Sequence, residues 1–327
     1  MMDRRRFLGA SAGLCALGGF GSRAGAELIN RNARLLVGFP AGGSVDIVAR
    51  LLVEQMKGYA ASMIVDNRPG AGGRTALEAL RTSEADGSVL ALTPGDQITL
   101  FPHVYNKLSY APPRDFAAVG TVCTVQFLLT VGPMVPPAVT TLAGFIAWCR
   151  ANPKLATFGS PGAGTRPHFI GAMLAQGAGL ELLHAPYKGS GPAIQDLLGG
   201  RIPAAIFVIS NTLTHVQSGA LRALATTAPQ RSLLLPQVPT MREAGFPALE
   251  GVEWFGVFVP AATPAETVTS LNGAVRRALA TDSVKAGLAQ QSIDVAGSSA
   301  SDLDRLMRFD AERWGEVVKA TGFRPID

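Results

Sequence analysis

Short apolar runs alternate with amphipathic stretches along the first part of the chain. The runs are typical of buried strands, whereas in the stretches between them apolar side chains recur on one face at helical spacing. Gly58 follows the first such stretch as a helix stop signal. The expected strands are residues 34–39, 63–65 and 89–92, and the expected helices are residues 44–57 and 75–81.

The same alternation restarts after a break. Residues 116–131 form a long, uncharged, β-rich run, and the Gly-Pro-Met-Val-Pro-Pro segment at 132–137 ends it. A break of this composition indicates a crossing into another domain. Beyond it, strands are expected at 156–158, 182–185, 202–208 and 221–226, and helices at 142–151, 167–177, 192–198 and 212–218.

The final segment has one apolar strand at 254–259, followed by helices at 265–280, 283–290 and 301–320. Because a single strand cannot form a sheet of its own, we expect this segment to return to the first domain and pack on it.

The predicted fold is α/β with two lobes, each a doubly wound parallel sheet flanked by helices, and a cleft between them. Lobe 1 is expected to comprise residues 27–130 and 253–327, and lobe 2 residues 131–252.

The first 26 residues read as an export signal peptide. Arg4, Arg5 and Arg6 precede a weakly apolar stretch at 9–20, and Ala24-Gly25-Ala26 fits a cleavage site after Ala26. The paired arginines before Phe-Leu resemble the twin-arginine motif, and an arginine-rich Sec signal is the alternative. The stretch is too short to span a bilayer. We therefore expect a soluble periplasmic protein.

Charge and cysteine content narrow the classes of partner and metal site. Residues 1–26 carry four arginines and one aspartate, so removing them lowers the net charge from +5 to +2. Such a nearly neutral chain without runs of like charge does not suggest a nucleic-acid partner. Cys123 and Cys149 remain after removal of the signal. A disulfide between them and two buried free thiols are both compatible with export.

Two glycine-rich loops, residues 39–46 and 158–168, each lie between an expected strand and helix. Glycines allow close backbone approach to a ligand, and the start of the next helix favours an anion. Each loop alone also fits an ordinary turn, but two matching loops favour binding. The expected ligand-binding residues are Phe39, Ala41, Gly42, Gly43, Ser44 and Asp46 in the first loop, and Ser160, Gly162, Ala163, Gly164, Thr165 and His168 in the second.

Weaker candidates supplement these loops. Arg166 either pairs with a ligand carboxylate or points to water, and His168 either contacts the ligand or is satisfied by local backbone. Lys188 is expected to be solvated rather than to face the cleft. The weaker ligand-binding candidates are Pro94, Arg166, Phe207 and Ser210.

Motifs of catalysis and cofactor binding are missing from the sequence. It contains no P-loop, no complete dinucleotide fingerprint and no nucleophile elbow, and its four histidines lack metal-ligand spacing. We therefore expect no cofactor, no metal and no catalytic residue.

An ordered set of motifs resembles the Bug family, the periplasmic solute-binding receptors of tripartite tricarboxylate transporters. The resemblance covers nearly the whole mature chain and implies a two-lobed Venus-flytrap receptor that binds a small carboxylate, partly through ordered water, at loops that map onto residues 39–46 and 160–168. The principal motifs are Phe39-Pro-x-Gly-Gly-x-x-Asp46, Asp66-Asn-Arg-Pro-Gly-Ala-Gly-Gly73, Gly159-Ser-x-Gly-x-Gly-Thr-x-x-His168, Pro186-Tyr-Lys-Gly189 and Leu235-Pro-x-Val-Pro-Thr240.

Three positions depart from the family pattern. Pro203 and Phe207 replace aspartates that are usual in the family, and Arg166 stands where a small or apolar residue is frequent. An apolar wall at Phe207, with helix starts and Arg166 holding an anion, would suit an aliphatic or aromatic monocarboxylate better than an amino acid or citrate.

The function expected is that of a monomeric, non-enzymatic binding protein that delivers its carboxylate to integral-membrane transporter subunits. One alternative is a receptor that presents the ligand to a membrane sensor. The other is an enzyme acting on a carboxylated substrate, although no nucleophile–base pair occurs at a recognisable spacing.

Overall fold

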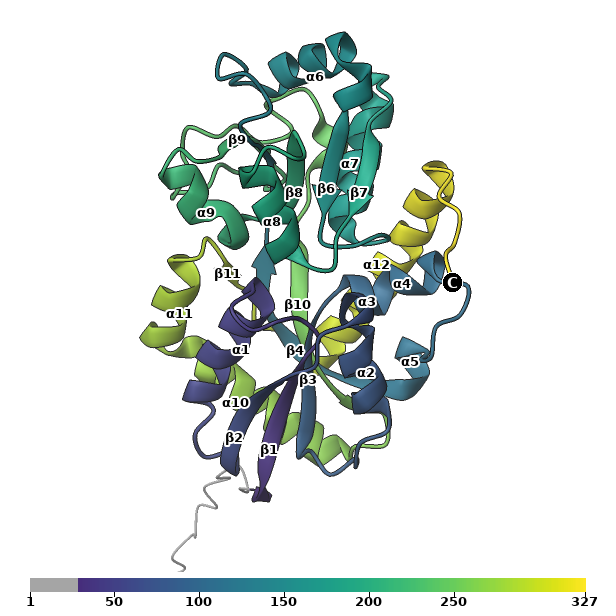
Figure 1. Cartoon of the computed structure of the whole chain (residues 1–327). Helices are drawn as coiled ribbons and strands as arrows, with labels where there is room; N and C mark the ends of the chain where they lie inside the picture. The colour runs from purple at the N-terminus through teal and green to yellow at the C-terminus, as the bar shows by residue number, and fades with distance from the viewer. Residues whose placement is uncertain (1–28) are drawn as a thin grey trace, which may run out of the picture.

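The computed structural model describes residues 29–327, which form two lobes, each built on one β-sheet (Figure 1). The export signal expected at 1–26 lies outside the described residues. The described part of the chain contains no helix that is both long and apolar enough to cross a membrane.

The first lobe contains a six-stranded sheet of order β11-β4-β10-β3-β1-β2. Its strands are β1 (Ile29–Val37), β2 (Ala60–Asn67), β3 (Val89–Pro94), β4 (Phe116–Val125), β10 (Glu253–Pro260) and β11 (Asp294–Val295). Its helices are α1 (Ser44–Gln55), α2 (Arg74–Arg81), α3 (Asp96–Thr99), α4 (Phe101–Val104), α5 (Pro112–Asp115), α10 (Ala265–Ala280), α11 (Asp282–Ala289) and α12 (Ala300–Ala320), with a 3₁₀ turn at Ala71–Gly73.

The second lobe contains a five-stranded sheet of order β7-β6-β8-β5-β9. Its strands are β5 (Phe127–Val131), β6 (Thr157–Ser160), β7 (Leu183–Pro186), β8 (Ala204–Val208) and β9 (Arg222–Thr226). Its helices are α6 (Leu142–Ala151), α7 (Arg166–Ala178), α8 (Ser190–Leu198) and α9 (Ile209–Gln217), with 3₁₀ turns at Pro153–Leu155 and Pro247–Leu249.

Both sheets are mixed, and the expectation of parallel sheets is wrong for the strands that connect the lobes. Strand β1 runs parallel to β2 and β3, but β10 runs antiparallel to β3 and β4. In the second sheet β5 is antiparallel to both β8 and β9. The reason is topological: β4 leaves the first lobe and β10 returns to it, so the two strands run in opposite directions side by side.

The first crossing between the lobes lies at Gln126, between β4 and β5. The sequence places it after residue 130, but Phe127–Val131 already pairs with the second sheet. Residues 132–137 therefore follow a second-lobe strand instead of joining the lobes. The chain returns through residues 227–252, and the three last helices then pack in the first lobe as expected (Figure 1).

Side chains at the first crossing are bonded to both lobes. Thr226 Oγ1 donates to Gln126 Oε1 at 2.6 Å, and Gln126 Nε2 donates to Ser292 Oγ at 3.2 Å. Ser292 Oγ also lies 2.6 Å from Ser232 Oγ of the second lobe. Side-chain hydrogen bonds from both lobes therefore hold the crossing residue Gln126 in place.

Complete burial explains why the strands read as uninterrupted apolar runs. Every residue of β3, β5, β8 and β10 is buried, as is usual for central strands covered on both faces.

Cys123 in β4 and Cys149 in α6 are buried free thiols. Because they belong to different lobes, the structure pairs neither with the other.

Candidate functional site

A cleft of about 430 Å³ lies between the lobes. The first lobe contributes the loop at 39–45, and the second contributes residues 188–192 and Ser210 with its neighbour Asn211. Residues at the starts of α1, α7, α8 and α9 all border this cleft. Helix starts present unpaired N–H groups and the positive end of the helix dipole, so their convergence favours an anion.

The first glycine-rich loop forms one side of the cleft, and Asp46 fixes its conformation through a hydrogen bond from Gly42 N. Five of the candidate residues of this loop line the cleft: Phe39, Ala41, Gly42, Gly43 and Ser44. Gly42 has a φ of +83°, which only glycine adopts readily, and its missing Cβ would meet nothing within 4 Å.

Asp46 does not line the cleft. Its side chain is 2% exposed and accepts hydrogen bonds from Gly42 N at 2.8 Å, Arg50 Nε at 2.8 Å and Asn67 Nδ2 at 2.9 Å. Burial alone would raise the pKa of Asp46, but these donors outweigh it and lower the pKa. Asp46 is therefore an ionised anchor that sets the loop conformation.

The second loop is largely folded back on itself. Ser160 is fully buried, and its Oγ lies 2.7 Å from His184 Nε2 and donates to the Gly162 carbonyl at 3.0 Å. His168 Nδ1 accepts from Gly164 N at 3.1 Å, and its ring stacks on that of His184 with centroids 3.8 Å apart. Burial lowers the pKa of His168 to about 4. Burial, and then the neighbouring His168, lowers that of His184 to about 3.

These contacts change the assignment of the second loop. Thr165 lines the cleft, as do Pro161 and Pro167 beside it. The structure does not bring the other expected residues of this loop to the cleft; they are Ser160, Gly162, Ala163, Gly164 and His168. They shape the backbone that carries Thr165.

Two weaker candidates line the cleft and two do not. Pro94 and Ser210 are part of its wall. Phe207 is fully buried with Ala193 and Leu197 in a core between α8 and its sheet, so it cannot form the expected apolar wall. Arg166 is 4% exposed and is bonded to Asp96 instead of facing the ligand space.

Several lining residues were not expected from the sequence. Apolar surface comes from Phe127, Val208 and Phe255, polar surface from Gln97 and Asn211, and acidic groups from Asp96 and Glu253. Residues 188–191 also line the cleft. Their glycine- and serine-rich sequence resembles that of the loops at 39–46 and 158–168, and this similarity is a signal that could have identified them.

Lys188 is exposed, as expected for a solvated lysine, but it also lines the cleft. It is the one lysine or arginine among the cleft-lining residues that the structure describes. Together with the four helix starts, it gives this space a positive contribution from the second lobe.

The acids come from the first lobe. Asp96 and Glu253 are each 3% exposed, and Glu253 Oε1 accepts from Asp96 N at 3.2 Å. Burial, and then the charge of Asp96, raises the pKa of Glu253 well above its ordinary value. The cleft is therefore electrostatically asymmetric between its two lobes.

A family model described as "Tripartite tricarboxylate transporter family receptor" matches residues 48–323 of the chain. Among curated proteins, the chain is similar to Protein BugT of Bordetella pertussis. The two are 32% identical over 298 residues, which cover 89% of this chain and 90% of BugT.

Solved structures give the same relation. The R. palustris protein Rpa4515, solved with adipate, is 31% identical with a TM-score of 0.86, and the match covers 92% of this chain and 100% of that one. MatC from Rhodopseudomonas palustris, with bound malate, is 28% identical with a TM-score of 0.81, over 88% of this chain and 99% of that one.

Proposed function

The chain belongs to the tripartite tricarboxylate transporter receptor family, also called the Bug family, and from that premise we propose that it captures a small monocarboxylate in its cleft for delivery to integral-membrane transporter subunits. This is a family of periplasmic binding proteins and not of enzymes.

The observation that carries the proposal is the convergence of four helix starts and Lys188 on one cleft of about 430 Å³. Helix N–H groups stabilise an anion without a full opposing charge, which suits a site that must also release its ligand. Two relatives were solved with the carboxylates adipate and malate, which supports the same ligand class here.

A single carboxylate fits this cleft better than two. Phe127, Val208 and Phe255 offer an apolar surface for a hydrocarbon tail. Asp96 and Glu253 line the same space, and Lys188 is the one basic side chain among the described lining residues, so the cleft offers no second cation for a second carboxylate. Arg166 does not supply a second cation to the cleft, because its guanidinium is paired with Asp96.

Export to the periplasm is part of the proposal. It is supported by the family and by the twin-arginine-like sequence and Ala-Gly-Ala site within residues 1–26. Cleavage after Ala26 would leave a chain that begins just before β1.

The proposal is tested by thermal unfolding in the presence of hexanoate or adipate, which have equal carbon number but one or two carboxylates. At equal ligand concentrations we expect hexanoate to stabilise the protein more than adipate does. Hexanoate at about 100 times its own Kd should stabilise the protein by about 2.7 kcal/mol relative to the ligand-free protein. Citrate serves as the tricarboxylate comparison. Greater stabilisation by adipate or citrate would overturn the preference for one carboxylate, and no response to any carboxylate would overturn the ligand class.

A further inference from the structure

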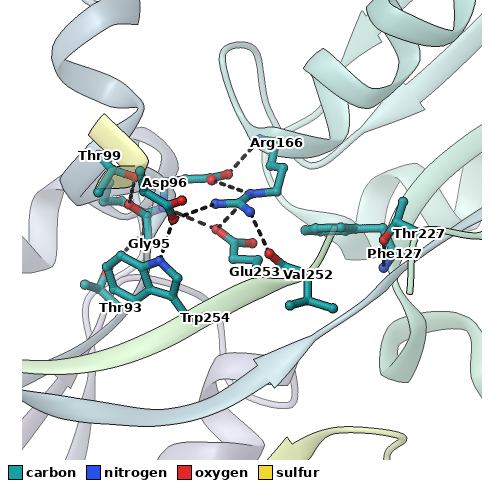
Figure 2. A network of polar contacts seen from close by, with 12 residues as sticks. Thr93, Gly95, Asp96, Thr99, Phe127, Arg166, Thr227, Val252, Glu253 and Trp254 are labelled. Carbon is teal, nitrogen blue, oxygen red and sulfur yellow. Dashed lines mark hydrogen bonds and ion pairs between the residues drawn. The ribbon is translucent and has the colours of Figure 1, made fainter. Parts of the chain in front are cut away.

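Arg166 reaches from the second lobe into the first. It is the first residue of α7, and its side chain is 5% exposed. Its guanidinium lies among three carboxyl groups of the first lobe, those of Asp96 on α3, Glu253 at the start of β10 and Asp310 on α12. Figure 2 shows Arg166 directed at Asp96 and Glu253.

Asp96 binds both the main chain and the side chain of Arg166. Its Oδ2 accepts from Arg166 N at 2.6 Å, and its Oδ1 accepts from Arg166 Nε at 3.1 Å. Arg166 Nη1 donates to the Val252 carbonyl at 2.8 Å (Figure 2). Glu253 Oε1 lies 4.0 Å from Nε, and Asp310 Oδ2 lies 3.9 Å from Nη2. One cation therefore serves three carboxyl groups and fixes the start of α7.

The three carboxyl side chains are only 4%, 5% and 7% exposed for Asp96, Glu253 and Asp310. Within residues 29–327, Arg166 is the sole basic side chain that forms ion pairs with them. Buried carboxylates without a cation are strongly unfavourable, even when one of them keeps its proton. The first lobe thus needs Arg166 only when the second lobe covers these groups.

Aromatic side chains pack beside the cluster, whose charged side chains are nearly fully buried. Phe169, one turn after Arg166, packs on Trp314 and Phe323 of the first lobe with ring centroids 6.1 and 5.2 Å apart. The Arg166 guanidinium itself lies 4.7 Å from the centroid of the Trp314 ring. Charge interactions are stronger in such a water-poor setting.

We propose that Arg166 is a positioning residue that latches the second lobe onto the first, by supplying the cation that the buried first-lobe carboxyl groups require when the lobes close. Asp96 and Glu253 also line the cleft, so the latch and the ligand space share two side chains. Without Arg166, water can solvate these carboxyl groups only when the lobes are open. The closed population then falls, and the apparent affinity for a ligand falls with it.

The first measurements need no ligand and compare Arg166→Met with the parent protein. The chain has three tryptophans, and Trp254 and Trp314 both belong to the cluster, since Trp254 Nε1 donates to Asp310 Oδ2 at 2.7 Å. In a Trp148→Phe background, acrylamide quenching reports on these two rings. We expect the variant to show stronger quenching and a larger radius of gyration by X-ray scattering than the parent.

Arg222→Met is the matched control. Arg222 is a partly buried arginine whose side chain donates to the carbonyls of Val135, Pro136 and Val139, all within the second lobe. Its removal deprives that lobe of comparable hydrogen bonds without touching the latch. We expect its quenching and radius of gyration to match the parent.

Two further variants keep the proposal decidable if Arg166→Met folds poorly. Arg166→Lys keeps the charge and should give an intermediate radius. Adding Asp310→Asn to Arg166→Met removes one carboxylate, keeps an acceptor for Trp254, and should restore part of the compact form. Hexanoate affinity should fall about 10-fold or more in Arg166→Met, within the usual range of coupling energies. A compact Arg166→Met that is quenched no more than the parent would overturn the latch. If Arg166→Met unfolds, an Arg166→Lys variant that unfolds to the same extent would overturn it, because restoring the charge would then restore nothing.

Discussion

Asp46 acts at the level of a single side chain by fixing the loop that borders the cleft. It appears among the expected ligand-binding residues because of its position in a glycine-rich motif. The structure instead gives it three hydrogen-bond donors inside the lobe, among them the N–H of the cleft residue Gly42. Sequence spacing identifies residues that belong to such a site, but it does not distinguish a ligand contact from a loop anchor.

His168 and His184 show the same distinction in the second loop. Their stacked rings, with Ser160 bonded to His184, hold the loop from within the lobe. His184 lies 16 positions beyond His168 in the chain, on an edge strand of the sheet. Their pairing depends on the parallel register of β6 and β7, in which Phe158 faces His184, and it has no local sequence signal.

The histidine pair predicts a loss of stability in mild acid. The pKa of His168 is lowered to about 4 and that of His184 to about 3, whereas both are near 6.5 when unfolded. The unfolded chain therefore binds protons first as the pH falls. The stability contribution is complete above pH 6.5 and decreases below it by about 1.4 kcal/mol per pH unit for each histidine, until its folded-state pKa is reached.

Urea unfolding between pH 7 and pH 4 measures this effect. The matched comparison is the double variant His168→Gln and His184→Gln, in which other titrating groups, including Glu253, are retained. We expect the wild type to lose more stability than this variant over the same pH range. Equal slopes for the two proteins would show that the histidines do not titrate as described.

At the level of elements, α7 joins the two lobes through close packing at its start. Gly164, two residues before α7, has a φ of +74°, and a Cβ there would lie 2.2 Å from Val104 Cγ1 in α4. Glycine at this position is required for the approach of the second lobe to the first. From the sequence, Gly164 was expected to allow close approach of a ligand. Its actual neighbour, Val104 in α4, lies far away in the chain and could not be identified from the loop sequence.

Gly164→Ala should therefore push the start of α7 away from α4. Gly179→Ala, at the other end of the same helix, is the control, since Gly179 has a φ of +59° and nothing within 4 Å of its missing Cβ. Both changes carry similar backbone strain, of order 1 kcal/mol. We expect only Gly164→Ala to enlarge the radius of gyration. An identical radius for both variants would mean that the contact with Val104 yields without moving the lobe.

The pattern of elements was the most predictable part of the fold. The helices expected at 44–57 and 265–280 correspond to α1 and α10, and the apolar runs correspond to fully buried strands. Strand direction was not predictable in β5 and β10, because a buried strand is apolar in either orientation. The crossing at Gln126 was missed for a related reason, since β4 and β5 form one continuous apolar run that passes from one sheet to the other.

For the whole molecule, the cleft exists only because two chain crossings bring the lobes together. Its first-lobe loop was predictable from glycine spacing. Glu253 and Asp96, which line the cleft, are single acids whose roles depend on the opposite lobe, and Lys188 was discounted as a surface lysine. Arg166 was expected to pair with a ligand carboxylate or to point to water. It pairs instead with carboxyl groups of the first lobe, which lie 70 or more positions away in the chain and could not be identified from local sequence.

The central claim, that the cleft captures a carboxylate against its helix starts, is tested most directly by calorimetric titration of hexanoate into the wild type, Gly42→Val and Gly58→Val. Gly42 lines the cleft at the start of α1, whereas Gly58 lies beyond the end of α1, and both have φ near +90° with open space at Cβ. A valine at Gly42 occupies ligand space and strains the loop. We predict at least a roughly 10-fold loss of affinity for Gly42→Val, as coupling of loop geometry to binding implies, and wild-type affinity for Gly58→Val. Equal affinities in all three proteins would contradict the account.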